Sequence, residues 1–67
     1  MTKFPERLKE LRKDKKLSQN ALSKQIGISQ AAIAKWEKGI IMPTIESAVI
    51  IAKFFNVSID YLAGLDN

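Results

Sequence analysis

The chain has 67 residues, 46% of them hydrophobic and 27% charged, and it contains neither cysteine nor histidine. This length supports one domain, and the hydrophobic fraction is too high for a disordered segment. Without cysteine or histidine the chain forms no disulfide and no zinc site of the Cys/His kind, and we expect no cofactor and no metal. We therefore expect a single domain over residues 1–67 with a small hydrophobic core.

Neither a secretion signal nor a membrane-spanning segment is indicated by the sequence. The first six residues lack the apolar core of a signal peptide. The most apolar stretch, residues 40–55, is interrupted by Pro43, Glu46 and Lys53 and is shorter than the ~20 residues that a membrane helix needs. We expect a cytoplasmic protein without a membrane partner, and the absence of cysteine is consistent with a reducing compartment.

Basic residues are concentrated in the first part of the chain. Residues 1–16 hold seven Lys/Arg and three acids, residues 17–39 hold three lysines and one acid, and residues 40–67 hold one lysine and three acids. The net charges are therefore +4, +2 and −2. This asymmetry indicates a face for a polyanion, although a solvated, lysine-rich first helix gives the same pattern.

Hydrophobic periodicity predicts a first helix over about residues 5–15. Phe4, Leu8 and Leu11 recur at helical spacing with charged residues between them, and Pro5 lies in the first turn, where its missing N–H costs nothing. Serine N-caps and closing glycines then predict two short helices: Ser18 and Gly27 around residues 19–26, and Ser29 and Gly39 around residues 30–37.

The remaining residues predict two further helices. Thr44 after Pro43 is an N-cap for a helix over about residues 45–55, and Ser58 caps a last one over about residues 59–63, which Gly64 ends. Since no segment alternates with the period of a half-buried strand, we predict an all-α fold, a compact five-helix bundle.

On the predicted fourth helix, a rotation of ~100° per residue divides the apolar side chains between two faces. The inward face is predicted to hold Ile45, Ala48, Val49, Ala52 and Phe55. Ile50 and Phe54 fall on the outward face, where we expect them to be exposed and to indicate an interaction surface.

Residues 17–39 have the outline of a helix-turn-helix: a capped helix, a glycine turn, a second capped helix and a closing glycine. Apolar side chains are expected to hold the two helices together, namely Leu22, Ile26, Ile28, Ile33 and Trp36. Trp36 shares a face with Ile33, so we assign it to the core rather than to a stacking platform for bases.

These residues resemble the Cro/phage-repressor (XRE-type) helix-turn-helix family, over about residues 4–62. The matching elements are Leu17-Ser18-Gln19, Ile26-Gly27-Ile28-Ser29, Ile33 with Trp36-Glu37 and Gly39, Pro43, Ile51-Ala52, and Val57-Ser58 with Asp60 and Leu62. The resemblance implies a lambda-repressor-like DNA-binding domain with the helix-turn-helix formed by helices 2 and 3. It also implies a sequence-specific transcriptional regulator, expected to be a repressor, whose third helix enters the major groove of a near-palindromic operator.

Carried over by position, the resemblance implies base contacts by residues of the third helix: Gln30, Ala31, Ala32, Ala34 and Lys35. Glutamine pairs with adenine, alanine contacts the thymine methyl group, and lysine reaches guanine or a phosphate. The alternative is that Gln30 is an ordinary exposed helix residue and that the alanines are present only because they are good helix formers. Contacts to DNA phosphates are expected from polar residues near the helix termini: Arg12, Ser18, Gln19, Ser29 and Lys38.

The resemblance also implies an ion pair between Arg12 on the first helix and Glu37 at the end of the third. The planar guanidinium suits a bidentate contact to a carboxylate. We expect the role of this pair to be chiefly structural, with a phosphate contact by Arg12 as a secondary function.

The chain departs from the family pattern in three places. One is the outward face of the predicted fourth helix, where Ile50 and Phe54 stand and relatives usually carry polar residues. Ser23 stands where relatives commonly have alanine, and the apolar Ile40-Ile41-Met42 precedes Pro43 where relatives are often basic. We hypothesise that exposed apolar residues form the interface of a homodimer: Ile40, Ile41, Ile50, Phe54 and Tyr61. They could instead cover one another, contact a missing part of the protein, or bind a partner protein as an antitoxin-like interaction module does.

An enzyme is the least supported class of function. The chain has no histidine or cysteine for acid–base or nucleophilic chemistry, and no glycine-rich phosphate loop or paired carboxylates. We therefore expect a non-enzymatic protein whose partners are double-stranded DNA and a second copy of itself.

Overall fold

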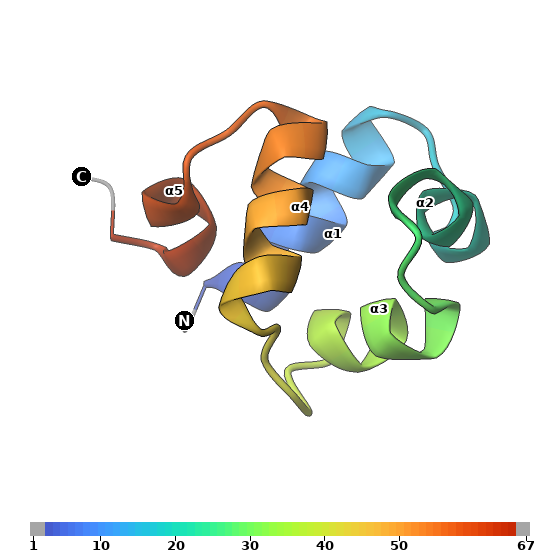
Figure 1. Ribbon diagram of the computed structural model, residues 1–67, viewed down its shortest axis with the longest axis horizontal. Helices are drawn as coiled ribbons and strands as arrows, with labels where there is room; N and C mark the ends of the chain where they lie inside the picture. Colours follow the sequence, from blue (N-terminus) through green and yellow to red (C-terminus); the bar gives the residue numbers. More distant parts are fainter. Residues whose placement is uncertain (1–2, 66–67) are drawn as a thin grey trace.

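The computed structural model describes residues 3–65, which form five α-helices and no strand (Figure 1). In chain order they are α1 (Phe4–Asp14), α2 (Gln19–Ile26), α3 (Gln30–Glu37), α4 (Ile45–Phe55) and α5 (Ile59–Ala63). The predicted all-α five-helix bundle is confirmed, and so are the bounds of α2 to α5, whereas α1 begins and ends one residue earlier than predicted. Over the described residues, no helix has the length and apolar character needed to cross a membrane.

Four of the helices begin at the predicted N-caps. In each case the side-chain hydroxyl oxygen accepts a hydrogen bond from the backbone N–H three residues later, which satisfies a donor that the first helical turn leaves unpaired. The pairs are Ser18 with Ala21 (3.0 Å), Ser29 with Ala32 (3.2 Å), Thr44 with Ser47 (3.1 Å) and Ser58 with Tyr61 (2.9 Å). Local sequence therefore determines where these helices start.

One hydrophobic core joins all five helices. Its buried members are Phe4, Leu8, Leu22, Ile33, Trp36, Ile51, Ala52, Phe55 and Leu62. The ring of Phe4 meets that of Trp36 edge to face, with 6.1 Å between the ring centroids. Trp36 is therefore a core residue, as predicted, and it anchors the inner side of α3 to α1.

The arrangement of the helices leaves α3 at one edge of the molecule (Figure 1). α1 packs against α3 and α5, α2 packs against α3 and α4, and α4 packs against α5. The inner face of α3 thus rests on α1 and α2, and its outer face is free to meet a partner.

Two of the predicted orientations on α4 are wrong. Ile45 was expected inward but is 82% exposed, because it lies in the first turn of the helix, where no other element covers it. Phe54 was expected outward, yet it is half-buried and packs against the core, with its ring edge-on to that of Phe55. The buried stripe instead runs through Ala48, Ile51, Ala52 and Phe55, with Ile51 fully buried.

This difference predicts unequal costs for the same substitution on one helix. Ile51→Val should lower the free energy of unfolding by about 0.5–1.5 kcal/mol, since it removes a buried methylene group. Ile45→Val should change it by less than about 0.5 kcal/mol, because that side chain is exposed. Urea unfolding followed by circular dichroism measures both, and equal losses in the two variants would contradict the burial described here.

Candidate nucleic-acid interface

The segment from Ser18 to Glu37 folds as a helix–turn–helix. Gly27 ends α2 with a φ of +71°, a left-handed conformation that costs glycine little and other residues more. The Ser23 hydroxyl on α2 donates a hydrogen bond to the carbonyl of Ile28 in the turn, at 2.5 Å. Serine at this position therefore ties α2 to Ile28, the residue that precedes the N-cap of α3.

The outer face of α3 carries most of the residues predicted to contact bases. Gln30, Ala31 and Lys35 are exposed and Ala34 is half-buried. Ala32 is half-buried and packs against the core, so it lies on the inner side of α3, contrary to its expected place among the base-facing residues. The surface that α3 offers to a ligand thus combines one amide, one ammonium group and small methyl groups.

Arg12 and Glu37 form the expected bidentate ion pair between α1 and α3. The guanidinium donates from Nε to Oε2 at 2.7 Å and from Nη2 to Oε1 at 2.9 Å. A third bond runs from Nη1 of Arg12 to the carbonyl of Leu17, at 2.8 Å. The two side chains are only 11% and 4% exposed, so the main role of Arg12 is to fix α1, α3 and the start of α2.

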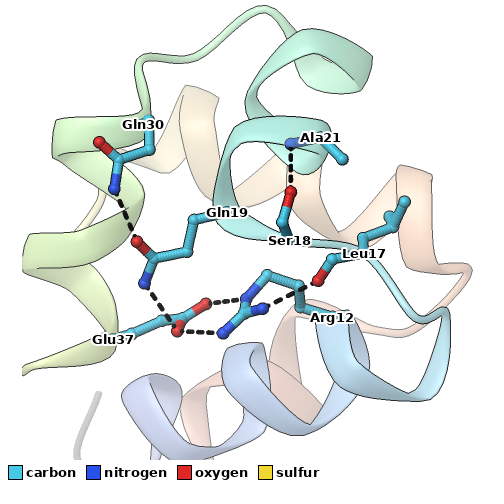
Figure 2. A network of polar contacts seen from close by, with 7 residues as sticks. All are labelled: Arg12, Leu17, Ser18, Gln19, Ala21, Gln30 and Glu37. Carbon is cyan, nitrogen blue, oxygen red and sulfur yellow. Dashed lines mark hydrogen bonds and ion pairs between the residues drawn. The ribbon is translucent and has the colours of Figure 1, made fainter.

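Two glutamines extend this ion pair to the surface (Figure 2). Nε2 of Gln19 donates to Oε1 of Glu37 at 3.1 Å, and Nε2 of Gln30 donates to Oε1 of Gln19 at 2.7 Å. The chain of contacts therefore runs from buried Arg12 to exposed Gln30. Sequence patterns did not predict these two glutamine contacts, although the Ser-Gln dipeptide recurs at the start of both helices, at residues 18–19 and 29–30.

The remaining residues predicted to contact phosphates lie at the helix ends. Ser18 and Ser29 are exposed at the N-termini of α2 and α3, and Lys38 is exposed after α3. Gln19 is half-buried and already bonded on both sides. Backbone N–H groups and the helix dipole at such N-termini attract anions, so this edge of the protein suits a phosphate backbone.

The predicted dimer residues do not have equal access to solvent. Ile40, Ile41 and Ile50 are 64%, 44% and 42% exposed. Phe54 is half-buried against the core, and Tyr61 is half-buried beneath the guanidinium of Arg7, which lies 4.2 Å from its ring centroid and also donates to its carbonyl. Met42 and Ile45, which are not among the predicted dimer residues, are also exposed, at 42% and 82%. We call the exposed residues Ile40, Ile41 and Met42 the apolar loop, and Ile45 follows it in the first turn of α4.

Opposing effects act on the pKa of the Glu37 carboxyl. Burial by itself raises this pKa, but the hydrogen bonds from Arg12 and Gln19 and the positive charges of Arg12 and Lys9 outweigh burial and hold the pKa below its ordinary value. The hydrogen bond to Glu37 raises the pKa of Arg12, and burial opposes this rise only in part. Both groups are therefore ionised at neutral pH.

The lowered pKa of Glu37 predicts a loss of stability in acid. The unfolded chain takes up a proton at Glu37 at higher pH than the folded chain does. The contribution of Glu37 to the free energy of unfolding is therefore complete above the ordinary pKa range of glutamate. It is lost as the pH falls through that range to the folded pKa. Urea unfolding between about pH 6 and about pH 3 should show the advantage of the wild type over Glu37→Gln shrinking as the pH falls.

A matched control is Glu10→Gln, which removes an exposed carboxylate from α1. The difference between wild type and this variant should stay small across the same pH range, because an exposed charge contributes little. Parallel curves for wild type and Glu37→Gln would contradict the prediction.

Comparison with known proteins identifies relatives over most of the chain. A family model described as helix-turn-helix matches residues 8–62. The HTH-type transcriptional activator BcrR of Enterococcus faecalis is 48% identical over 59 residues, 88% of this chain and 29% of the relative. The repressor protein C2 of Salmonella phage P22 is 39% identical over 57 residues, 85% of this chain and 26% of the relative. The cryptic phage CTXphi transcriptional repressor RstR of Vibrio cholerae is 40% identical over 62 residues, 92% of this chain and 55% of the relative.

The chain thus spans from about a quarter to a little over half the length of these relatives. Among solved structures, the P22 c2 repressor in complex with synthetic operator 9T matches with a TM-score of 0.83 and 37% sequence identity. The match covers 88% of this chain and 89% of the repressor chain in that structure. Sequence and fold therefore agree over the same helices.

Proposed function

The chain belongs to the helix-turn-helix family, and on that premise we propose that it is a sequence-specific DNA-binding transcriptional regulator. α3 enters the major groove, where Gln30, Ala31 and Lys35 meet base edges, with Ala34 beside them. Residues 1–67 act as one DNA-binding domain without a catalytic role, and the protein works in the cytoplasm.

The observation that carries this proposal is the exposed polar face of α3, which an ion pair and a core tryptophan fix against α1. Base readout requires side chains that are held in place, and a short helix anchored on its inner side meets that requirement. The fold match to a repressor crystallised with its operator supports the same assignment. In this proposal the exposed Ser18, Ser29 and Lys38 contact DNA phosphates.

Repression is the mode of regulation that we propose. Two of the relatives named above are repressors and one is an activator, and a small domain bound over a promoter excludes polymerase by occupancy alone. The alternative of an antitoxin-like module devoted to a partner protein is not favoured, because the matched relatives are transcriptional regulators.

Selection from a random duplex library at physiological salt tests the DNA-binding proposal. The wild type should enrich one motif, because in this proposal α3 contacts base edges and the protein does not bind through phosphate contacts alone. Lys35→Ala should lower affinity for that motif by about five- to 150-fold. Lys53→Ala removes the same charge from an exposed position on α4 and should leave affinity within a few-fold of wild type. No enriched motif, or equal losses in both variants, would overturn the assignment of α3.

The exposed apolar residues support the proposal of a homodimer. We propose that the apolar loop, together with Ile50, meets its counterpart in a second copy, which places two α3 helices about one DNA turn apart on a near-palindromic operator. The half-buried Phe54 and Tyr61 contribute at most the edges of this contact. An apolar surface beside the DNA-binding helix suits this arrangement, since both halves of a palindrome must be bound at once.

Sedimentation velocity at micromolar concentration, with and without operator DNA, checks this arrangement. A species of twice the 7.5 kDa chain mass should form, and Ile40→Glu should abolish it by placing a charge in the apolar contact. Gln25→Glu adds the same charge to an exposed position on α2 and should leave dimerisation unchanged. Monomer alone under all conditions would refute the dimer.

A further inference from the structure

The outward side of α4 carries four residues at helical spacing. Positions i, i+3, i+4 and i+7 of one helical face are held by Glu46, Val49, Ile50 and Lys53. Val49 is half-buried and the other three are exposed, whereas the buried stripe of α4 runs along the opposite side. In Figure 1, α4 lies at the front of the view and no other helix covers it. We call these four residues the α4 stripe.

The α4 stripe has an apolar centre and charges of opposite sign at its two ends. The acid Glu46 lies in the first turn of the helix and the base Lys53 in the last. The midpoint of these two residues along the sequence is also the midpoint of Val49 and Ile50. The charged ends are about 10 Å apart along the helix axis, so they do not pair with each other. Among the residues that the structure describes, neither Glu46 nor Lys53 forms an ion pair.

A two-fold axis through this midpoint makes the α4 stripe complementary to itself. In an isologous contact, residue i of one copy meets residue j of the other, and j meets i. Two α4 helices packed antiparallel about such an axis bring Glu46 of each copy to Lys53 of the other, with the apolar residues between the two ion pairs. Parallel packing would instead place like charges opposite each other, which is unfavourable.

The residues beyond the two ends of α4 suit the same arrangement. Antiparallel packing places the start of each α4 beside the end of its counterpart. The apolar loop, which precedes α4, then comes near the segment that follows α4 in the second copy, where Ile59 is 39% exposed. The antiparallel register thus offers apolar surface to residues that are exposed in the single chain.

We propose that the two copies of the homodimer meet through the α4 stripe in antiparallel register, with ion pairs between Glu46 of each copy and Lys53 of the other. The inference rests on the proposed homodimer and deepens it, because it names the register and the charges by which the chain recognises a second copy of itself. Each exposed ion pair contributes little to affinity. The pairs act on specificity, because a parallel partner or one with the opposite charge pattern brings like charges together.

Charge reversal, followed by sedimentation velocity without DNA, tests this register. Glu46→Lys alone sets lysine against lysine at both ends of the contact, and Lys53→Glu alone sets glutamate against glutamate. Each variant should raise the dissociation constant of its homodimer at least about tenfold, since like charges replace attractive ones. Lys53→Ala only removes the exposed pairs, so it should change the dissociation constant by a few-fold.

An equimolar mixture of the two charge-reversal variants should dimerise as the wild type does. In the mixed dimer the introduced lysine faces the introduced glutamate, and the native Lys53 of one chain faces the native Glu46 of the other. Recovery on mixing requires that both variants are folded, which excludes misfolding as the cause of the loss. Glu46 and Lys53 also suit the helix dipole of their own chain, but mixing cannot restore that effect.

A matched control is the pair Glu10→Lys on α1 and Lys24→Glu on α2. These variants make the same changes of charge at exposed positions outside the α4 stripe. Each should form homodimers as the wild type does, and mixing them should not increase the dimer fraction. Dimerisation of the control pair only on mixing would show that net charge, and not the register, governs association.

The outcomes separate this register from the proposed homodimer. A wild type that stays monomeric refutes both and leaves the α4 stripe to a different occupant. If Ile40→Glu abolishes the dimer and both charge reversals leave it intact, the homodimer stands and the register is overturned. Loss in the single variants without recovery on mixing overturns the register as well. Loss in each variant with recovery on mixing, and no such effect in the control pair, supports it.

Discussion

The bidentate contact between Arg12 and Glu37 is the interaction on which the geometry of this surface depends. It joins α1 to the last residue of α3, and through the Leu17 carbonyl and Gln19 it also reaches the start of α2. A buried charge pair of this kind adds modest net stability, because desolvation offsets much of the attraction. The ion pair acts chiefly on orientation. The guanidinium donors meet the carboxylate in few geometries, so the pair restricts the relative positions of the helices that carry the two side chains.

Around this pair the molecule divides its surface by chemistry. The edge formed by α2 and α3 presents amides, hydroxyls and lysines, whereas the loop after α3 presents isoleucines and a methionine. A polar edge beside an apolar loop fits a protein that reads DNA through one surface and meets its own copy through the next. In the proposed dimer, the contact beside α3 would set the spacing of the two DNA-binding helices.

Sequence patterns predicted the local structure well, for reasons that are themselves local. The caps at Ser18, Ser29, Thr44 and Ser58 depend on a hydroxyl meeting a backbone N–H three residues away, so the sequence alone indicates them. The orientations on α4 were less predictable. Periodicity gives the direction in which Ile45 and Phe54 point, but only the packed neighbours decide whether anything covers them.

The sequence by itself determined five helices, the starting residues of the four that follow α1, and the resemblance that pairs Arg12 with Glu37. The tertiary structure alone decided that Ala32 packs inward and that the ion pair continues through Gln19 to Gln30. The physical reason is the range of the forces: capping and helical periodicity act within four residues along the chain. The hydrogen bond between two glutamines eleven residues apart exists only because a glycine turn and a buried carboxylate bring their side chains together and fix which end of each amide faces the other.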